Sequence, residues 1–180
     1  MFKLVIDSNE NYDEASGRFI YTKPQTLRLE HSLISISKWE SKWHKPFLKD
    51  DKKTHEEELD YVRCMVIDQE PDPDTLRALT RKQLEDIFSY VNDSMTATWF
   101  NERNKKAPSR RVITSELIYY WMVALEIPFS CEKWHLNRLL TLIKVCNAEN
   151  APKKKMNKKE QMAQRKSLNA ARRQKYNTKG

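Results

Sequence analysis

The chain has 180 residues, with 33 Lys or Arg, 25 Asp or Glu and only two glycines. Its length suits one domain with its own core, and the scarcity of glycine argues against a β-sandwich, a β-barrel and a glycine-rich phosphate-binding loop. Residues 151–180 hold eleven Lys or Arg and one acid, which leaves 22 basic and 24 acidic residues in 1–150. We therefore expect a mainly α-helical globular domain over residues 1–150, followed by a basic tail, helical or disordered, over residues 151–180.

The cysteines and the absence of long apolar stretches indicate a cytoplasmic protein. Cys64, Cys131 and Cys146 are odd in number and show no repeated spacing, which favours reduced thiols. No stretch approaches the roughly 20 apolar residues that a membrane span needs, and acidic residues follow Met1 too soon for a signal peptide. We expect no membrane partner.

Short apolar stretches near the N-terminus predict a small β-sheet. Residues 2–6, FKLVI, are followed by Asp7-Ser8-Asn9, which predicts a loop. Residues 18–22 and 26–30 are candidates to pair with the first stretch.

Three helices are predicted next, each from its capping residue. Ser32 begins a helix that runs to Trp43, although its alternating Ser and Ile residues also fit a strand. Thr54 and Glu57 form a capping box for the second helix, and Thr80 caps the third. Their expected core residues are Leu33, Ile36, Trp39 and Trp43, then Leu59, Val62, Cys64, Met65 and Val66, then Leu84, Ile87, Phe88 and Val91.

Residues 112–147 are the most apolar part of the chain and predict an antiparallel helix pair. Thr114 or Ser115 caps the first helix, Pro128 ends it, and Ser130 caps the second. The expected inward faces are Leu117, Ile118, Trp121, Ala124 and Leu125 on the first helix, and Leu136, Leu139, Leu140, Ile143 and Cys146 on the second.

The aromatic residues exceed what this helix pair can bury. Tyr119, Tyr120, Trp121 and Trp134 add apolar bulk that must contact other helices of the chain or a partner. Trp is enriched where proteins bind each other, although filling the core is the alternative role for each. The candidate partner-binding residues are Trp39, Trp43, Trp99 and Phe100.

No pattern of catalytic, cofactor-binding or metal-binding residues is present. The carboxylates at 56, 57, 58 and 60 are expected to spread around an exposed helix face, and no nucleophile pattern accompanies them. Cys131, His135 and Cys146 cannot share an ion, because one helix separates the two cysteines by about 22 Å. We therefore expect a non-enzymatic protein without a cofactor.

The basic tail suits either phosphates or acidic protein surfaces, or serves solubility alone. Clustered cations neutralise phosphates, but only Tyr176 is available to stack on a base. The basic residues singled out are Lys153, Lys154, Lys155, Lys158, Lys159, Arg165, Lys166, Arg172 and Arg173.

Three stretches also resemble a group of small proteins encoded in the structural-gene regions of tailed bacteriophages, the tail assembly chaperones. They are residues 29–48, LEHSLISISKWESKWHKPFL, residues 96–100, TATWF, and residues 118–156, which begin IYYWMVALEIPFS. They cover about half of the chain and contain no catalytic signature.

The resemblance implies a helper in the host cytoplasm that binds the tape measure protein and tail-tube subunits and is absent from the mature virion. It also implies a longer product made by ribosomal frameshifting, for which the codons of Pro152 to Lys155 are the candidate site. Self-association remains open. The alternative is a nucleic-acid-associated phage structural protein that uses its basic tail.

Overall fold

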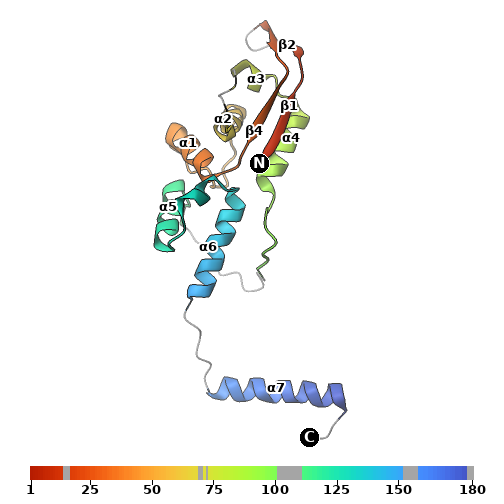
Figure 1. Ribbon diagram of the computed structural model, residues 1–180, viewed down its shortest axis with the longest axis vertical. Coiled ribbons are helices and arrows are strands. Elements are labelled where there is room, and N and C mark those ends of the chain that lie inside the picture. The colour runs from red at the N-terminus through yellow and green to blue at the C-terminus, as the bar shows by residue number, and fades with distance from the viewer. Residues whose placement is uncertain (14–16, 69–70, 72, 101–110, 152–157, 178–180) are drawn as a thin grey trace. The chain divides into compact units, whose positions relative to one another are not determined.

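The computed structural model describes the chain except for residues 14–16, 69–70, 72, 101–110, 152–157 and 178–180. The chain forms two compact units, residues 1–147 and 148–180. Helices dominate, and strands are confined to the N-terminal part of the described chain (Figure 1). The predicted fold class, mainly α with a small N-terminal β structure, is confirmed.

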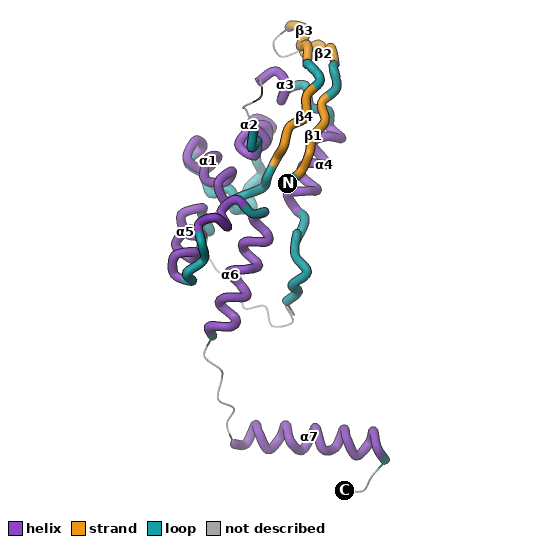
Figure 2. The backbone as a smooth tube through the Cα atoms, viewed as in Figure 1, coloured by secondary structure: helices purple, strands orange, loops and turns teal. Residues whose placement is uncertain are grey.

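The strands form a long two-stranded ribbon (Figure 2). Strand β1 (Phe2–Ile6) pairs antiparallel with β4 (Gln25–Leu29), and β2 (Asn9–Asp13) pairs antiparallel with β3 (Arg18–Thr22). The numbers of two paired residues add up to the same value in both ladders, so both ladders have the same register. The two sheets are therefore the two halves of one interrupted hairpin.

The ribbon corrects two expectations. Residues 9–13 form a strand where a loop was expected to begin, and residues 18–22 pair with this strand rather than with β1. The sequence NENYD has little β propensity of its own, so its conformation depends on its partner strand. In the β1–β4 half, Leu4, Ile6, Leu27 and Leu29 share one buried face, as strand alternation requires.

Three capped helices follow as predicted. Helix α1 (Leu33–Trp43) starts at the N-cap Ser32, α2 (His55–Met65) at Thr54 and α4 (Arg81–Asn92) at Thr80, each with a reciprocal capping box. The partner three residues into each helix is Ser35, Glu57 and Gln83, respectively. The short helix α3 (Pro73–Arg77) was not predicted.

Both helices of the predicted pair are present, but the second helix starts late, and the first packs chiefly against α1 rather than against its predicted partner. Helix α5 (Ser115–Ala124) is followed by a short 3-10 helix, η2 (Phe129–Lys133), and then by α6 (Leu136–Asn150). Ser130 lies inside η2 and is not the cap of α6. The reason is tertiary, because Ser32 and His135 form a β-bridge and Leu136 N–H donates to His31 O at 2.7 Å.

One core joins these elements within residues 1–147. Helix α1 contacts α2, α5 and η2, while α4 contacts β1 and α3 contacts both α2 and β3. The largest fully buried side chains are Trp39, Tyr61, Leu29, Leu33, Ile36, Met65, Ile87, Ile118, Met122, Leu136, Leu139 and Val62. The unit 148–180 contains helix α7 (Lys158–Tyr176).

Candidate partner-binding surface

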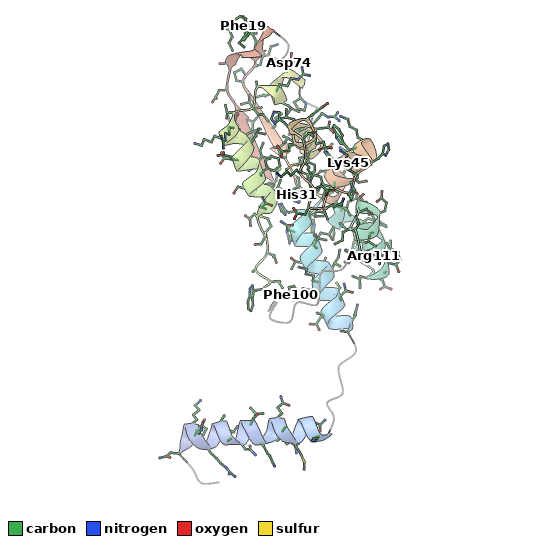
Figure 3. The ribbon with its side chains drawn as sticks, turned by 180° about the vertical axis from the view of Figure 1, so that it is seen from behind. Phe19, His31, Lys45, Asp74, Phe100 and Arg111 are labelled. Carbon is green, nitrogen blue, oxygen red and sulfur yellow. The ribbon has the colours of Figure 1, made fainter. Side chains whose placement is uncertain are left out.

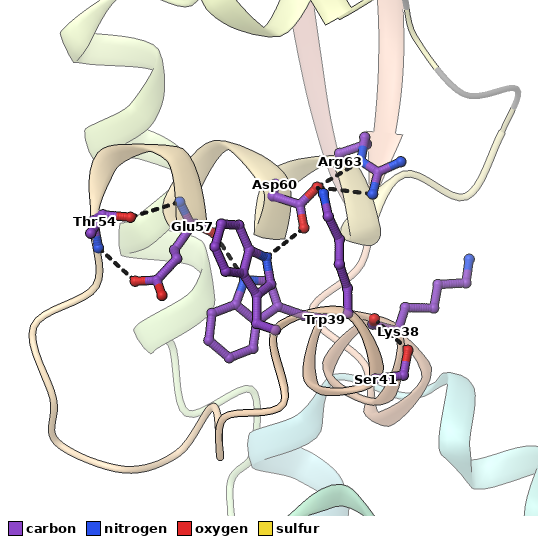
Figure 4. A network of polar contacts seen from close by, with 9 residues as sticks. Lys38, Trp39, Ser41, Thr54, Glu57, Asp60 and Arg63 are labelled. Carbon is purple, nitrogen blue, oxygen red and sulfur yellow. Dashed lines mark hydrogen bonds and ion pairs between the residues drawn. The ribbon is translucent and has the colours of Figure 1, made fainter.

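Trp39 lies in the core, which corrects its expected place on a binding surface. Its side chain is 1% exposed, and its indole N–H donates to the backbone oxygen of Glu57 at 2.9 Å (Figure 4). Half-buried Trp43 stacks beside it at 6.2 Å between ring centroids and donates to Asp60 Oδ2 at 2.8 Å. Both tryptophans therefore join α1 to α2.

Glu57 and Asp60 are also buried, in contrast to the exposed carboxylate face that we expected. Lys45 pairs with Glu57 at 2.5 Å, and Lys42 pairs with Asp60 at 2.6 Å. The hydrogen bond from Lys45 is the main cause that lowers the pKa of Glu57. For Asp60, burial raises the pKa, but the hydrogen bonds from Lys42 and Trp43 outweigh burial, so the pKa of Asp60 is also lowered. Both carboxylates are thereby held ionised between α1 and α2, in positions suited to structure.

The other two expected residues lie just before residues 101–110. Trp99 is 80% exposed, and Phe100 is half-buried (Figure 3). Of the four candidate partner-binding residues, Trp99 is the one whose ring is fully available at the surface.

The outward side of α5 and the adjoining η2 form an exposed apolar surface, which we call the α5 apolar face. It comprises Tyr119, Tyr120, Val123, Ala124 and Phe129. Tyr120 is 63% exposed, Val123 61% and Phe129 57%. The first four lie at helical spacing on one side of α5, and the Tyr119 and Phe129 rings lie 6.3 Å apart.

This face exists because α5 is apolar around most of its circumference. Only Ser115, Ile118 and Met122 are buried against the rest of the domain. A helix that is apolar on all sides is normally buried on all sides, whereas α5 has a partner on one side only among the described residues. The face therefore has the character of an interface with one partner missing.

Polar contacts fix the edge of the face. The Tyr119 hydroxyl donates to Glu132 Oε2 at 2.9 Å, which ties α5 to η2. Burial, followed by this hydrogen bond and the negative charge of Glu132, raises the pKa of Tyr119 to about 12. Tyr119 is therefore a neutral, oriented ring at the side of the exposed Tyr120 and Val123.

Sequence reasoning found part of this face and missed the rest. The surplus of aromatic residues around Tyr119 and Tyr120 was recognised, but Val123 and Phe129 were not, although the run VALEIPF continues the same apolar segment. It also missed a second exposed aromatic group on the β2–β3 half of the ribbon, where Tyr12 and Phe19 lie 5.2 Å apart beside Tyr21.

The basic residues singled out in the tail lie either outside the described residues or on α7. Lys153, Lys154 and Lys155 lie outside the described residues, whereas Lys158 is the first residue of α7. The other five, Lys159, Arg165, Lys166, Arg172 and Arg173, are exposed on α7.

Within the described part of the chain, no group of three or more His, Cys, Asp or Glu side chains is arranged to hold a metal ion. None of its helices is long and apolar enough to cross a membrane. Cys64, Cys131 and Cys146 are all free thiols.

Comparison of the chain with protein-family models, curated proteins and solved structures found no match in any of the three. The α5 apolar face and the other exposed side chains described above are therefore the features that bear on function.

Proposed function

We propose that this chain is a non-enzymatic protein-binding factor, a tail assembly chaperone of a tailed bacteriophage. Its clients are the tape measure protein and tail-tube subunits, it acts in the host cytoplasm, and it is absent from the mature virion. The phage assignment comes from the sequence resemblance, and the protein-binding activity is supported by the α5 apolar face.

The single observation that carries the proposal is the exposure of Tyr120, Val123 and Phe129 beside a helix whose other side is buried in the core. Single exposed apolar residues are common on protein surfaces, but a contiguous group that includes aromatic rings is typical of binding sites. The inward side of α5 is fixed by Ile118 and Met122 in the core, so the outward side is presented without rearrangement.

An amphipathic helix of the client is the occupant that fits this face. Tyr120, Val123 and Ala124 lie three and four residues apart, and such rows form the ridges that pack into the grooves of a second helix. Helix α5 spans about 15 Å, which corresponds to nearly three turns of a client helix. A protein that covers such client helices keeps their apolar stripes from aggregating before assembly.

Co-purification with a tape-measure segment tests the proposal. The variant Tyr120→Ser with Val123→Ser removes two exposed apolar side chains from the face, and it should lose the client while its thermal unfolding stays unchanged. The matched control Val5→Ser with Ile67→Ser removes two similarly exposed apolar side chains from β1 and from the segment after α2, and it should retain the client.

Retention of the client by the α5 variant would contradict the proposal, as would equal loss in both variants. Gene context supplies an independent check, since a long tape-measure gene immediately downstream supports the assignment and a replication neighbourhood contradicts it.

A further inference from the structure

Helix α7 carries a repeated basic pattern that protein binding at α5 does not use. Pairs of basic residues recur every seven residues along the helix. The five residues between successive pairs are EQMAQ and SLNAA, of which Glu160 alone is charged. The pairs are Lys158-Lys159, Arg165-Lys166 and Arg172-Arg173.

The helical period places these cations on one side. At 3.6 residues per turn, seven residues make nearly two turns, so each repeat returns to almost the same face. Lys159, Arg165, Lys166, Arg172 and Arg173 fall within an arc of about 140°, with successive pairs about 10 Å apart along the axis. All five side chains are exposed. We call this surface the α7 basic face.

The rest of α7 argues against a lipid surface as the partner. A helix that lies on a membrane needs bulky apolar residues opposite its cations. In α7 the side opposite the cations carries mostly small or polar residues and the cation Lys175, with Leu168 as its one bulky apolar residue, while Met162 lies among the cations. The helix therefore has a charged side but no side that would enter a bilayer.

We propose that the α7 basic face binds double-stranded nucleic acid through its phosphates. A straight row of cations matches the regular row of charges on a duplex, and α7, about 28 Å long, spans most of one duplex turn of about 34 Å. Single strands are disfavoured, because α7 offers only Tyr176 for base stacking. Because phosphate contacts carry no sequence information, we expect this contact to be independent of base sequence.

Three forms of the full-length protein test this inference. The face variant is Arg165→Gln, Arg172→Gln and Arg173→Gln. The control variant is Lys153→Gln, Lys154→Gln and Lys155→Gln, which removes the same charge from the segment before α7. Affinity for a labelled DNA duplex of about two turns is measured by fluorescence anisotropy over a series of salt concentrations.

The unmodified protein should bind with a slope of log affinity against log salt of about −4 or steeper, as five phosphate contacts require. The face variant should have a slope shallower by about 3, and the control variant should change it by less than about 1. The Tyr120→Ser, Val123→Ser variant should bind the duplex normally, so this inference stands or falls separately from the proposed function.

Three outcomes would overturn the inference. The first is an equal effect of the face and control variants, which would mean that net charge alone attracts the duplex. The second is equally strong competition by polyglutamate of matched charge, which would assign the face to acidic proteins. The third is equal or tighter binding to phosphatidylserine vesicles, which would assign it to a lipid surface.

Discussion

Glu40 caps the N-terminus of α5 from a position 75 residues earlier in the chain, where its Oε2 atom accepts the Ser115 N–H at 2.7 Å. Its other carboxylate oxygen accepts the Phe47 N–H at 2.8 Å. A carboxylate at this position suits both the unpaired N–H groups and the positive end of the helix dipole. Thr114, the N-cap residue, makes no side-chain capping bond of its own.

We predict that Glu40→Ala destabilises the domain by about 2–4 kcal/mol, because two buried N–H groups lose a charged acceptor. Urea denaturation measures the change. The control is Ser41→Ala, the neighbouring exposed position on α1, which should change the free energy of unfolding by less than about 0.5 kcal/mol. A Glu40→Ala effect as small as the control would show that water replaces the carboxylate.

A second prediction concerns the stability of the domain at acidic pH. His31 and His135 are both buried, with ring centroids 5.0 Å apart, and His31 is hydrogen-bonded to the Tyr61 hydroxyl. Burial, with a smaller contribution from His135, lowers the pKa of His31 to about 3 from its ordinary value of 6.5. Between these values the unfolded chain binds a proton that the folded chain does not, so stability is full above pH 6.5 and falls as the pH decreases.

The measurement is the free energy of unfolding at pH 7 and pH 5, which should fall by about 2 kcal/mol through His31. Carboxylates with a lowered pKa, such as Glu57 and Asp60, contribute their own loss mainly below about pH 5. His31→Gln should reduce the dependence between pH 7 and 5 to the part that His135 contributes, because burial lowers the pKa of His135 as well, whereas His44→Gln, at an exposed position, should leave the dependence intact. An unaltered slope in His31→Gln would exclude His31 as the cause.

Neighbouring leucines of α6 offer a matched pair of substitutions. The sequence pattern placed Leu139 and Leu140 on the same buried face, but Leu139 is fully buried and Leu140 only half-buried. Leu139→Ala should destabilise the fold by about 2–5 kcal/mol and Leu140→Ala by distinctly less. Equal costs in chemical denaturation would mean that the unit 1–147 does not pack as described.

Removal of the tail gives a fourth prediction. Every α7 side chain that the structure describes, which leaves out Lys158 and Glu160, is exposed, and residues 1–147 form a compact unit with their own core. A chain shortened to residues 1–150 should therefore unfold cooperatively on heating, with near-UV circular dichroism like that of the full chain. A molten or insoluble product would show that the tail contributes to the core.

The last prediction belongs to the gene. Pro152-Lys153-Lys154-Lys155 lies outside the described residues and follows α6 closely, so a change of reading frame there would keep the domain and replace the tail. We predict a slippery adenine run at these codons and a minor product that diverges after about residue 154. Mass spectrometry of infected cells should detect peptides that join the two frames. Lysine codons interrupted by AAG, with a single product, would contradict frameshifting and weaken the chaperone assignment.

The sequence by itself determined the features that depend on short-range contacts. The starts of α1, α2 and α4 were predictable because a cap and its partner are three residues apart, as with Thr54 and Glu57. The boundary between the domain and the basic tail was also predictable, because the density of positive charge rises sharply after residue 150. The surplus of apolar residues around Tyr120 was also visible, which is why a partner was expected.

Only the tertiary structure decided which apolar residues are hidden and which remain at the surface. Trp39 and Tyr120 are both large aromatic residues on helices, and the packing of α2 over Trp39 distinguishes them. Likewise, α6 begins at Leu136 because His31, more than 100 positions earlier, accepts its N–H. Such decisions depend on contacts between residues that are distant in the chain, and local spacing carries no information about those contacts.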